Sequence, residues 1–264
     1  MDLNLVRLSI IGPLTENFVS WLIANGYEQD AFDRPDIGPS GSFGGKINSA
    51  QQYTSAELYA TTWGDTWGTG NIFDGYNTMH TCSYLVDLRR FLEAILAYTG
   101  APKVDIIAHS MGVVLARKVI KGGELIATDG NCSLGRPLSE RIDTFLGRIA
   151  GPNYGICVCQ LAQTVPAWCN ALDGLYPGYT CEDQLLCGYT TSPCGEQVNY
   201  SAFLEKLNRN PSREADYIFA FCWGKPTARI PGMNGRWVSD RLGHIAMKDY
   251  TELRQFEAVT THRV

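Results

Sequence analysis

The chain has 264 residues, with 22 Lys and Arg against 27 Asp and Glu and a formal net charge of -5 at pH 7. This length suits one large α/β domain with a full hydrophobic core. The negative charge argues against nucleic acid or an anionic membrane surface as the main partner, and no apolar run in the sequence is long enough to span a bilayer.

The amino-terminal quarter alternates short apolar runs with loop-like sequence. Polar residues interrupt the run 3–11, which lacks the hydrophobic core and cleavage site of a signal peptide, so we do not predict one. Residues 14–26 predict an amphipathic helix that stops at Asn25-Gly26. Residues 31–52 are rich in Gly, Ser, Pro and Asp and predict a loop, whereas 57–62 favour a strand.

The middle of the chain predicts a helix, a strand and a second helix in direct succession. Leucine and isoleucine recur at helical spacing over residues 84–98, and Gly100 and Pro102 end that helix. Residues 103–107 carry β-branched side chains in a short run, as a buried parallel strand requires, and 113–120 continue as an apolar stretch of helical length. This succession is typical of a doubly wound sheet.

Ser110 lies at the turn between that strand and that helix, within Ala108-His-Ser-Met-Gly112. A serine on a strained strand-to-helix turn, with small residues two positions before and two after it, is the nucleophile elbow of an α/β-hydrolase. The motif is usually written with glycine at both places, and Ala108 is a mild variant. We therefore predict an α/β-hydrolase-type, mostly parallel sheet flanked by helices, with Ser110 as nucleophile.

Downstream of the elbow, strands are predicted over 143–150 and 217–222, a short helix over 202–208, and a helical stretch from Met247 onward. Residues 151–199 lack regular periodicity and are rich in Gly, Pro and Tyr, so they predict an insertion or cap pinned by disulfides. The expected organisation is a single domain over residues 1–264, with its core in 53–150 and 200–264.

The cysteines predict an oxidising compartment. Nine are present, and six of them fall between Cys157 and Cys194, a density typical of disulfide-bonded proteins. The alternative of a metal site is disfavoured because none of the four histidines lies in this cluster and paired C-x-x-C knuckles are lacking. The odd total leaves at least one thiol free, or its partner missing from this chain, and the disulfide connectivity stays open.

A serine nucleophile needs a base, which in α/β-hydrolases follows the serine and the acid along the chain. Only His244 and His262 lie downstream of Ser110. His262 is two residues from the end of the chain, where chains fray, so His244 is the predicted general base. His109, inside the elbow, is expected to be a packing residue.

The sequence around Ser110 resembles the class 2 lipases, a secreted group with small bacterial triacylglycerol lipases and a large nematode set, and the nematode members are nearest in appearance. Further matching strings are Ala56-Glu-Leu-Tyr-Ala-Thr-Thr-Trp-Gly-Asp65, Val119-Ile-Lys-Gly-Gly123, Asp143-Thr-Phe-Leu-Gly147, Trp223-Gly-Lys-Pro-Thr227 and Ile230-Pro-Gly232. The resemblance implies carboxylic-ester hydrolysis of lipids without a cofactor, with Ser110 as nucleophile and His244 as base. The backbone N–H of Met111 takes one oxyanion-hole position, because the residue after the nucleophile donates there.

Two features depart from that family. Its members carry an apolar strand ending in His-Gly, whose turn supplies the second oxyanion donor, and the sequence predicts that this strand is missing before Tyr53. The acid is also open: Asp216 has the right chain order but precedes its strand, Asp240 lies near His244, and the third possibility is that the acid is absent. A truncated or alternatively spliced chain would explain both the missing segments and the odd cysteine.

The sequence thus predicts a serine lipase or carboxylesterase acting on a lipid or small ester substrate, with transient contact to a lipid interface. The alternative is an inactive relative that binds lipid or a protein partner. Cysteine content and resemblance favour a secreted, extracellular protein, and no cofactor or metal is expected.

Overall fold

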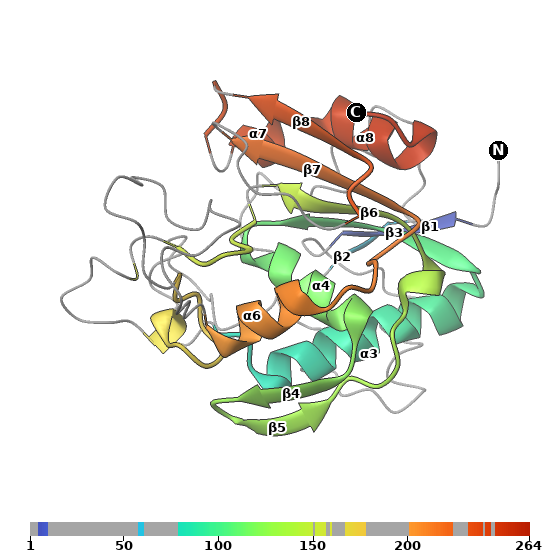
Figure 1. Ribbon diagram of the computed structural model, residues 1–264. Coiled ribbons are helices and arrows are strands. Elements are labelled where there is room, and N and C mark those ends of the chain that lie inside the picture. Colours follow the sequence, from blue (N-terminus) through green and yellow to red (C-terminus); the bar gives the residue numbers. More distant parts are fainter. Residues whose placement is uncertain are drawn as a thin grey trace.

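The computed structural model describes residues 5–9, 58–60, 79–149, 151–156, 159, 167–177, 201–223, 232–239, 241–243 and 246–264. Six of the described strands form a parallel sheet in the order β2-β1-β3-β6-β7-β8 (Figure 1). Their bounds are β1 Leu5–Ser9, β2 Leu58–Ala60, β3 Lys103–His109, β6 Ile142–Ile149, β7 Tyr217–Trp223 and β8 Gly235–Ser239. Since the strands are parallel, all their carboxyl ends lie at one edge of the sheet.

Helices cover both faces of this sheet (Figure 1). On one face lie α3 (Cys82–Thr99), α4 (Met111–Lys121) and α6 (Ala202–Arg209); on the other lie α7 (Ala246–Asp249) and α8 (Glu252–Thr261). Neighbouring residues of a strand point to opposite faces, so Ile106 and Phe145 join the core below α3 and α4, while Ile107 and Leu146 pack with α7 and α8. The predicted α/β architecture with a parallel sheet is confirmed.

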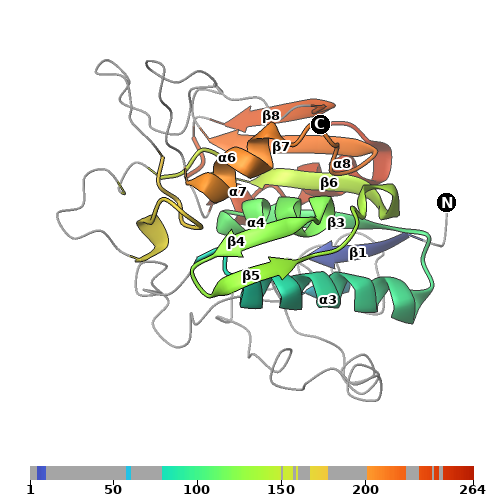
Figure 2. The ribbon, with the colours of Figure 1, turned by 60° about the horizontal axis from the view of Figure 1, so that its bottom comes forward.

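A two-stranded hairpin, β4 (Glu124–Ala127) paired with β5 (Gly130–Ser133), lies outside α3 and α4 (Figure 2). It is joined to the first residue of α3 by the disulfide Cys82–Cys132. The carboxylate of Asp129, in the hairpin turn, also accepts hydrogen bonds from the backbone N–H groups of Cys82 and Ser83 at 2.8 and 2.9 Å. The hairpin therefore holds the amino end of α3, whose first N–H groups have no acceptor within the helix.

The predicted elements agree with the described ones to within a few residues. The helix expected over 84–98 is α3, and Gly100 ends it in the left-handed conformation with φ 64°. The strands expected over 57–62, 143–150 and 217–222 are β2, β6 and β7, and the helix expected over 202–208 is α6. The helix and loop predicted within 14–52 lie outside the described residues.

β1 corrects the expectation that a core strand is missing. It is parallel to both neighbours, with Arg7 level with Leu58 of β2 and with Asp105 of β3, so it fills the position between them. The polar residues that interrupt 3–11 argue against a signal peptide but not against a short strand. A parallel strand of five residues needs a much shorter apolar run than a signal peptide does, so the polar residues within 3–11 do not exclude a strand there.

A second disulfide, Cys159–Cys169, confirms that the cysteine-rich segment contains such bonds. The 3-10 helices η3 (Ser139–Arg141) and η4 (Ala167–Cys169) complete the described elements. No helix in the described ranges has the length and apolar character needed to cross a membrane.

Candidate active site at the carboxyl edge of the sheet

Ser110 is the single residue between β3 and α4 in the chain, and its backbone has φ 54° and ψ -132°. A positive φ brings Cβ of a non-glycine residue close to its own backbone and typically costs about 1–3 kcal/mol. Among the described non-glycine residues only Ser110 and His262 have positive φ. The chain therefore maintains a strained conformation at the residue that the sequence predicts to be the nucleophile.

The strained turn is held by the end of β6. The backbone N–H of Ser110 donates to the carbonyl of Ile149 at 2.9 Å, and the N–H of Val113 donates back to the carbonyl of Ser110 at 3.1 Å. Just beyond β6, a Cβ placed on Gly151 would lie 2.7–2.8 Å from the side chain of Val113. Only glycine fits there, so the loop that leaves β6 packs directly against the first turn of α4.

The first residues of α4 form the polar side of this site. Met111 is the first residue of the helix, and both it and Ser110 are half-buried. The first N–H groups of a helix have no acceptor within it and carry a partial positive charge. This arrangement can stabilise an oxyanion that develops beside Ser110.

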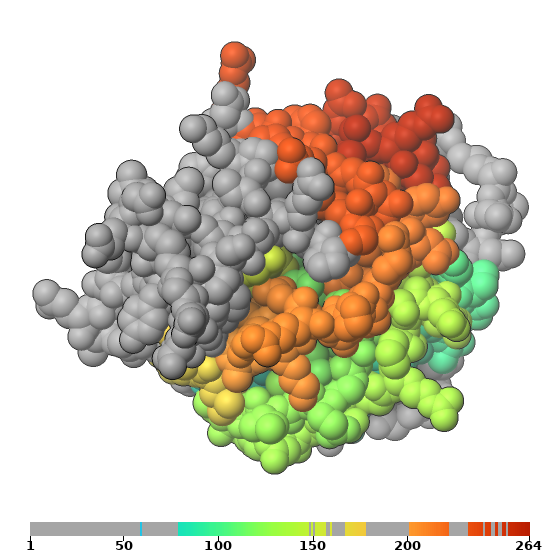
Figure 3. Space-filling model, viewed as in Figure 1, coloured from blue at the N-terminus to red at the C-terminus, as the bar shows by residue number. Residues whose placement is uncertain are grey.

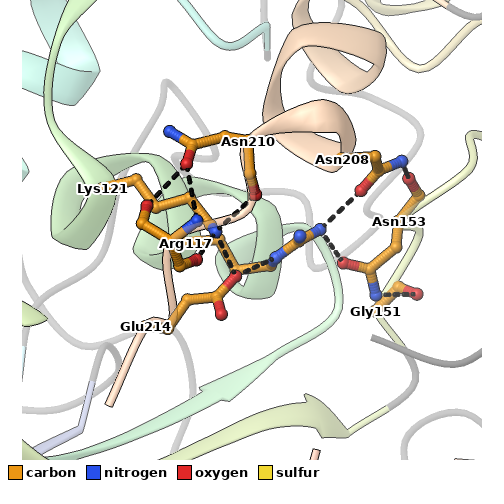
Figure 4. A network of polar contacts seen from close by, with 8 residues as sticks. Arg117, Lys121, Gly151, Asn153, Asn208, Asn210 and Glu214 are labelled. Carbon is orange, nitrogen blue, oxygen red and sulfur yellow. Dashed lines mark hydrogen bonds and ion pairs between the residues drawn. The ribbon is translucent and has the colours of Figure 1, made fainter. Parts of the chain in front are cut away.

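A buried ion network fixes α4 against the loop that leaves β6 (Figure 4). The guanidinium of Arg117 donates to Glu214 at 2.9 Å, to Asn153 at 2.7 Å and to Asn208 at 2.8 Å. Arg117 and Glu214 are each about 1% exposed. Lys121 lies 3.4 Å from the same carboxylate, and burial lowers its pKa. These contacts join the elbow helix, the post-β6 loop, α6 and the segment before β7.

His262 lies at the opposite edge of the sheet from Ser110. Its Nε2 is 2.9 Å from the carboxylate of Asp143, and its ring stacks on Tyr217 with 3.7 Å between centroids. Asp143 is near the start of β6 and Tyr217 begins β7. A strand of seven residues spans about 20 Å, so this histidine is far from the elbow.

His244 itself lies outside the described residues. Its described flanks, Gly243 and Ala246, follow the carboxyl end of β8. Because the sheet is parallel, β8 ends at the same edge as β3. Of the two downstream histidines, only His244 therefore belongs to a connection that starts from the edge of Ser110.

The two candidates for the catalytic acid also differ in the edge of the sheet at which they lie in the chain. The carboxylate of Asp216 is bonded to Nζ of Lys103, the first residue of β3, and Asp216 immediately precedes β7. It thus lies at the amino edge of the sheet, as its position before the strand predicted. Asp240 directly follows β8 in the chain and is outside the described residues.

The feature that sequence reasoning missed is the connection after β1. Ser9, the last residue of β1, is level with Ile107 of β3, so β1 ends at the edge where Ser110 lies. The sequence continues as Ile10-Ile-Gly-Pro13, which has a glycine but no histidine. The sequence signal for this connection is Gly12, which directly follows the apolar run 3–11.

The described residues contain no group of three or more His, Cys, Asp and Glu side chains placed to hold a metal ion. The model of the family described as Lipase (class 2) matches residues 46–257. A search of curated proteins finds no match to the chain.

Proposed function

The chain belongs to the class 2 lipase family, and from that premise we propose that it hydrolyses carboxylic esters of lipids with Ser110 as nucleophile. The observation that carries the proposal is the backbone of Ser110, with φ 54° at the turn from β3 to α4. Such a conformation is costly for serine, and it is the one in which a nucleophile elbow presents its hydroxyl at the carboxyl edge of a parallel sheet.

In the proposed reaction, the hydroxyl oxygen of Ser110 attacks the ester carbonyl carbon while His244 takes the hydroxyl proton. The tetrahedral intermediate collapses when the alkoxide leaves and receives that proton, which forms the alcohol and an acyl-enzyme. A water molecule, deprotonated by His244, then attacks the acyl carbon. The ester bond to Ser110 breaks, the serine recovers its proton, and the carboxylic acid is released.

The oxyanion of each intermediate needs two hydrogen-bond donors. The backbone N–H of Met111 supplies the first, since it begins α4 and has no acceptor within the helix. We assign the second donor to the connection after β1, because that strand neighbours β3 and ends at the same edge. Removing one donor of this kind costs about 10²–10³ in rate.

The sequence offers Asp216 and Asp240 as candidates for the acid that orients His244. Asp216 is engaged by Lys103 at the amino edge, which leaves Asp240 or a site without an acid. An Asp240→Asn variant separates the two. If Asp240 orients His244, kcat falls about 10⁴-fold, and if the site has no acid, kcat is unchanged.

Covalent labelling with a fluorophosphonate tests the nucleophile directly. The expected result is one probe on the peptide that contains Ser110, and none on a Ser110→Ala variant. Two histidine variants provide a matched pair: His244→Asn should slow labelling strongly, whereas His262→Asn should leave it unchanged because its ring is paired with Asp143. Equal labelling of wild type and Ser110→Ala would refute the assignment.

A second candidate is an inactive relative that binds lipid without turning it over. The observation in its favour is that Asp216, which has the chain order of an acid, serves an ion pair elsewhere. Folded protein that resists the probe, and whose lipid binding is unchanged in Ser110→Ala, would favour this second function. The two disulfides indicate an extracellular or other oxidising compartment for either function.

A further inference from the structure

A pocket of about 210 Å³ lies at the carboxyl end of α4, where α6 and β4 meet it. In Figure 3 the orange surface of α6 borders the green surface of the β4–β5 hairpin in this region. α4 has 11 residues and rises 1.5 Å per residue, so the pocket is about 16 Å from Ser110. It is therefore separate from the elbow.

Apolar side chains form the inner wall and the rim of this pocket. Leu125, Phe203 and Leu207 line it and are each at most 5% exposed. Ile126 and Leu172 line it too, but they are 59% and 36% exposed and form an apolar rim. An apolar cavity of about 150 Å³ accommodates a six-carbon ring, so this volume suits an alkyl chain of somewhat greater length.

Two ammonium groups share the polar side of the pocket. Nζ of Lys118 and Nζ of Lys206 donate to the same carbonyl, that of Glu124, at 3.0 and 3.2 Å. The two nitrogens are therefore within about 6 Å of each other, where like charges repel. Burial, and secondarily the charge of Lys206, lower the pKa of Lys118 to about 8.

Within the described part of the chain, the neighbouring cations have ion pairs, whereas Lys118 and Lys206 have none. Lys121 is paired with Glu214 and Arg209 with Glu205. The carboxylate of Glu124, which also lines the pocket, acts on Lys118 only by raising its pKa against the effect of burial. Nζ of Lys118 already donates to three carbonyls. Nζ of Lys206 is exposed and donates to only one, so it retains donors for an anion.

We propose that this pocket binds a free medium-chain carboxylate, with its alkyl chain against Leu125, Phe203 and Leu207 and its carboxylate on Lys206. The charge of the anion relieves the repulsion between the two lysines, and its chain covers the apolar rim. The inference goes beyond the proposed hydrolysis and does not depend on it. If hydrolysis occurs, the acids it releases belong to this chemical class.

Titration calorimetry of octanoate into the full-length protein tests the proposal. Lys206→Glu should weaken octanoate binding at least ten-fold, since a charge-assisted hydrogen bond is replaced by repulsion. Arg209→Glu is the matched control, because it changes the charge equally on the same helix but lies outside the pocket, and its effect should be below two-fold. Hexanoate should bind about fifteen-fold more weakly than octanoate, as the loss of two buried methylene groups predicts.

Three results would overturn the proposal: no octanoate binding at millimolar concentration, equal effects of the two charge reversals, or equal binding of octanoate and octan-1-ol. Lys206→Met serves as a second variant if melting curves show that the reversal perturbs the fold. The fluorophosphonate reacts at Ser110, which does not line this pocket, so failure here is distinct from failure of the fluorophosphonate test.

Discussion

Acidification should destabilise the fold through His80, which is fully buried before α3. Its Nδ1 is 2.6 Å from the backbone carbonyl of Asp173, and its ring stacks on Phe203 at 4.1 Å. A carbonyl only accepts, so Nδ1 carries the proton of the neutral ring and Nε2 is bare. Nε2 is buried and has no hydrogen-bond partner among the described residues, so a second proton there would be unpaired.

Burial lowers the pKa of His80 from 6.5 to about 4, although Asp173 opposes this shift. The unfolded chain therefore takes up this proton at higher pH than the folded chain does. The stabilising effect of neutral His80 is complete above pH 6.5 and is lost as the pH falls from 6.5 to 4. Between pH 7.5 and 5.0, this one group lowers the free energy of unfolding by about 2 kcal/mol.

Urea denaturation of wild type and His80→Asn at both pH values isolates the contribution of His80 to the pH dependence of the free energy of unfolding. Asparagine keeps a donor for the Asp173 carbonyl but does not titrate. It also loses the stack on Phe203, but that loss is the same at both pH values. Wild type should lose about 2 kcal/mol more than the variant on going from pH 7.5 to 5.0. Equal losses would refute the reasoning.

Three further changes should alter stability measurably in urea denaturation. Ser110→Gly should raise the free energy of unfolding by about 1 kcal/mol because glycine accepts positive φ, whereas Ser110→Ala should not raise it. Equal free energies of unfolding for the two variants would contradict the strain at Ser110. Replacing Cys82 and Cys132 together by serine should cost about 4 kcal/mol, since the bond closes a loop of 50 residues, and an unchanged midpoint would contradict this. Arg117→Met should lower the free energy of unfolding by about 3–5 kcal/mol because it leaves the buried carboxylate of Glu214 without its main partner. A loss below about 1 kcal/mol, which is typical of exposed ion pairs, would contradict this expectation.

The part of the fold that could be predicted from sequence is the part with strong local patterns. The repeat of leucines in α3 and the β-branched run before Ser110 each extend over several residues, so their type is read without knowledge of neighbours. β1 has only five residues and includes Arg7, and its place is decided by pairing with β3, which begins some hundred residues later. Long-range pairing of this kind leaves no local trace.

In the candidate site, too, the local features could be predicted from the sequence and the long-range contacts could not. The elbow is a local feature, because the strained residue, the strand and the helix are adjacent in the chain. The network around Arg117 joins segments up to 97 residues apart, and its charged residues give no sign in the sequence that they are buried. Likewise, the disulfide Cys82–Cys132 lies outside the cysteine-rich segment, and its two cysteines are 50 residues apart, so no local pattern pairs them.

Chain order alone would accept a wrong set of catalytic residues. Ser110, Asp216 and His262 follow one another in the order serine, acid, histidine. Yet the acid is bonded to the start of β3 and the histidine to the start of β6, so both lie at the amino edge while the serine lies at the carboxyl edge. The length of the strands separates them by about 20 Å, far beyond hydrogen-bond reach. The position of a residue at one or the other edge of a parallel sheet is therefore a stronger criterion for a catalytic role than its order in the chain. This criterion favours His244 over His262, although His262 has a carboxylate partner in Asp143.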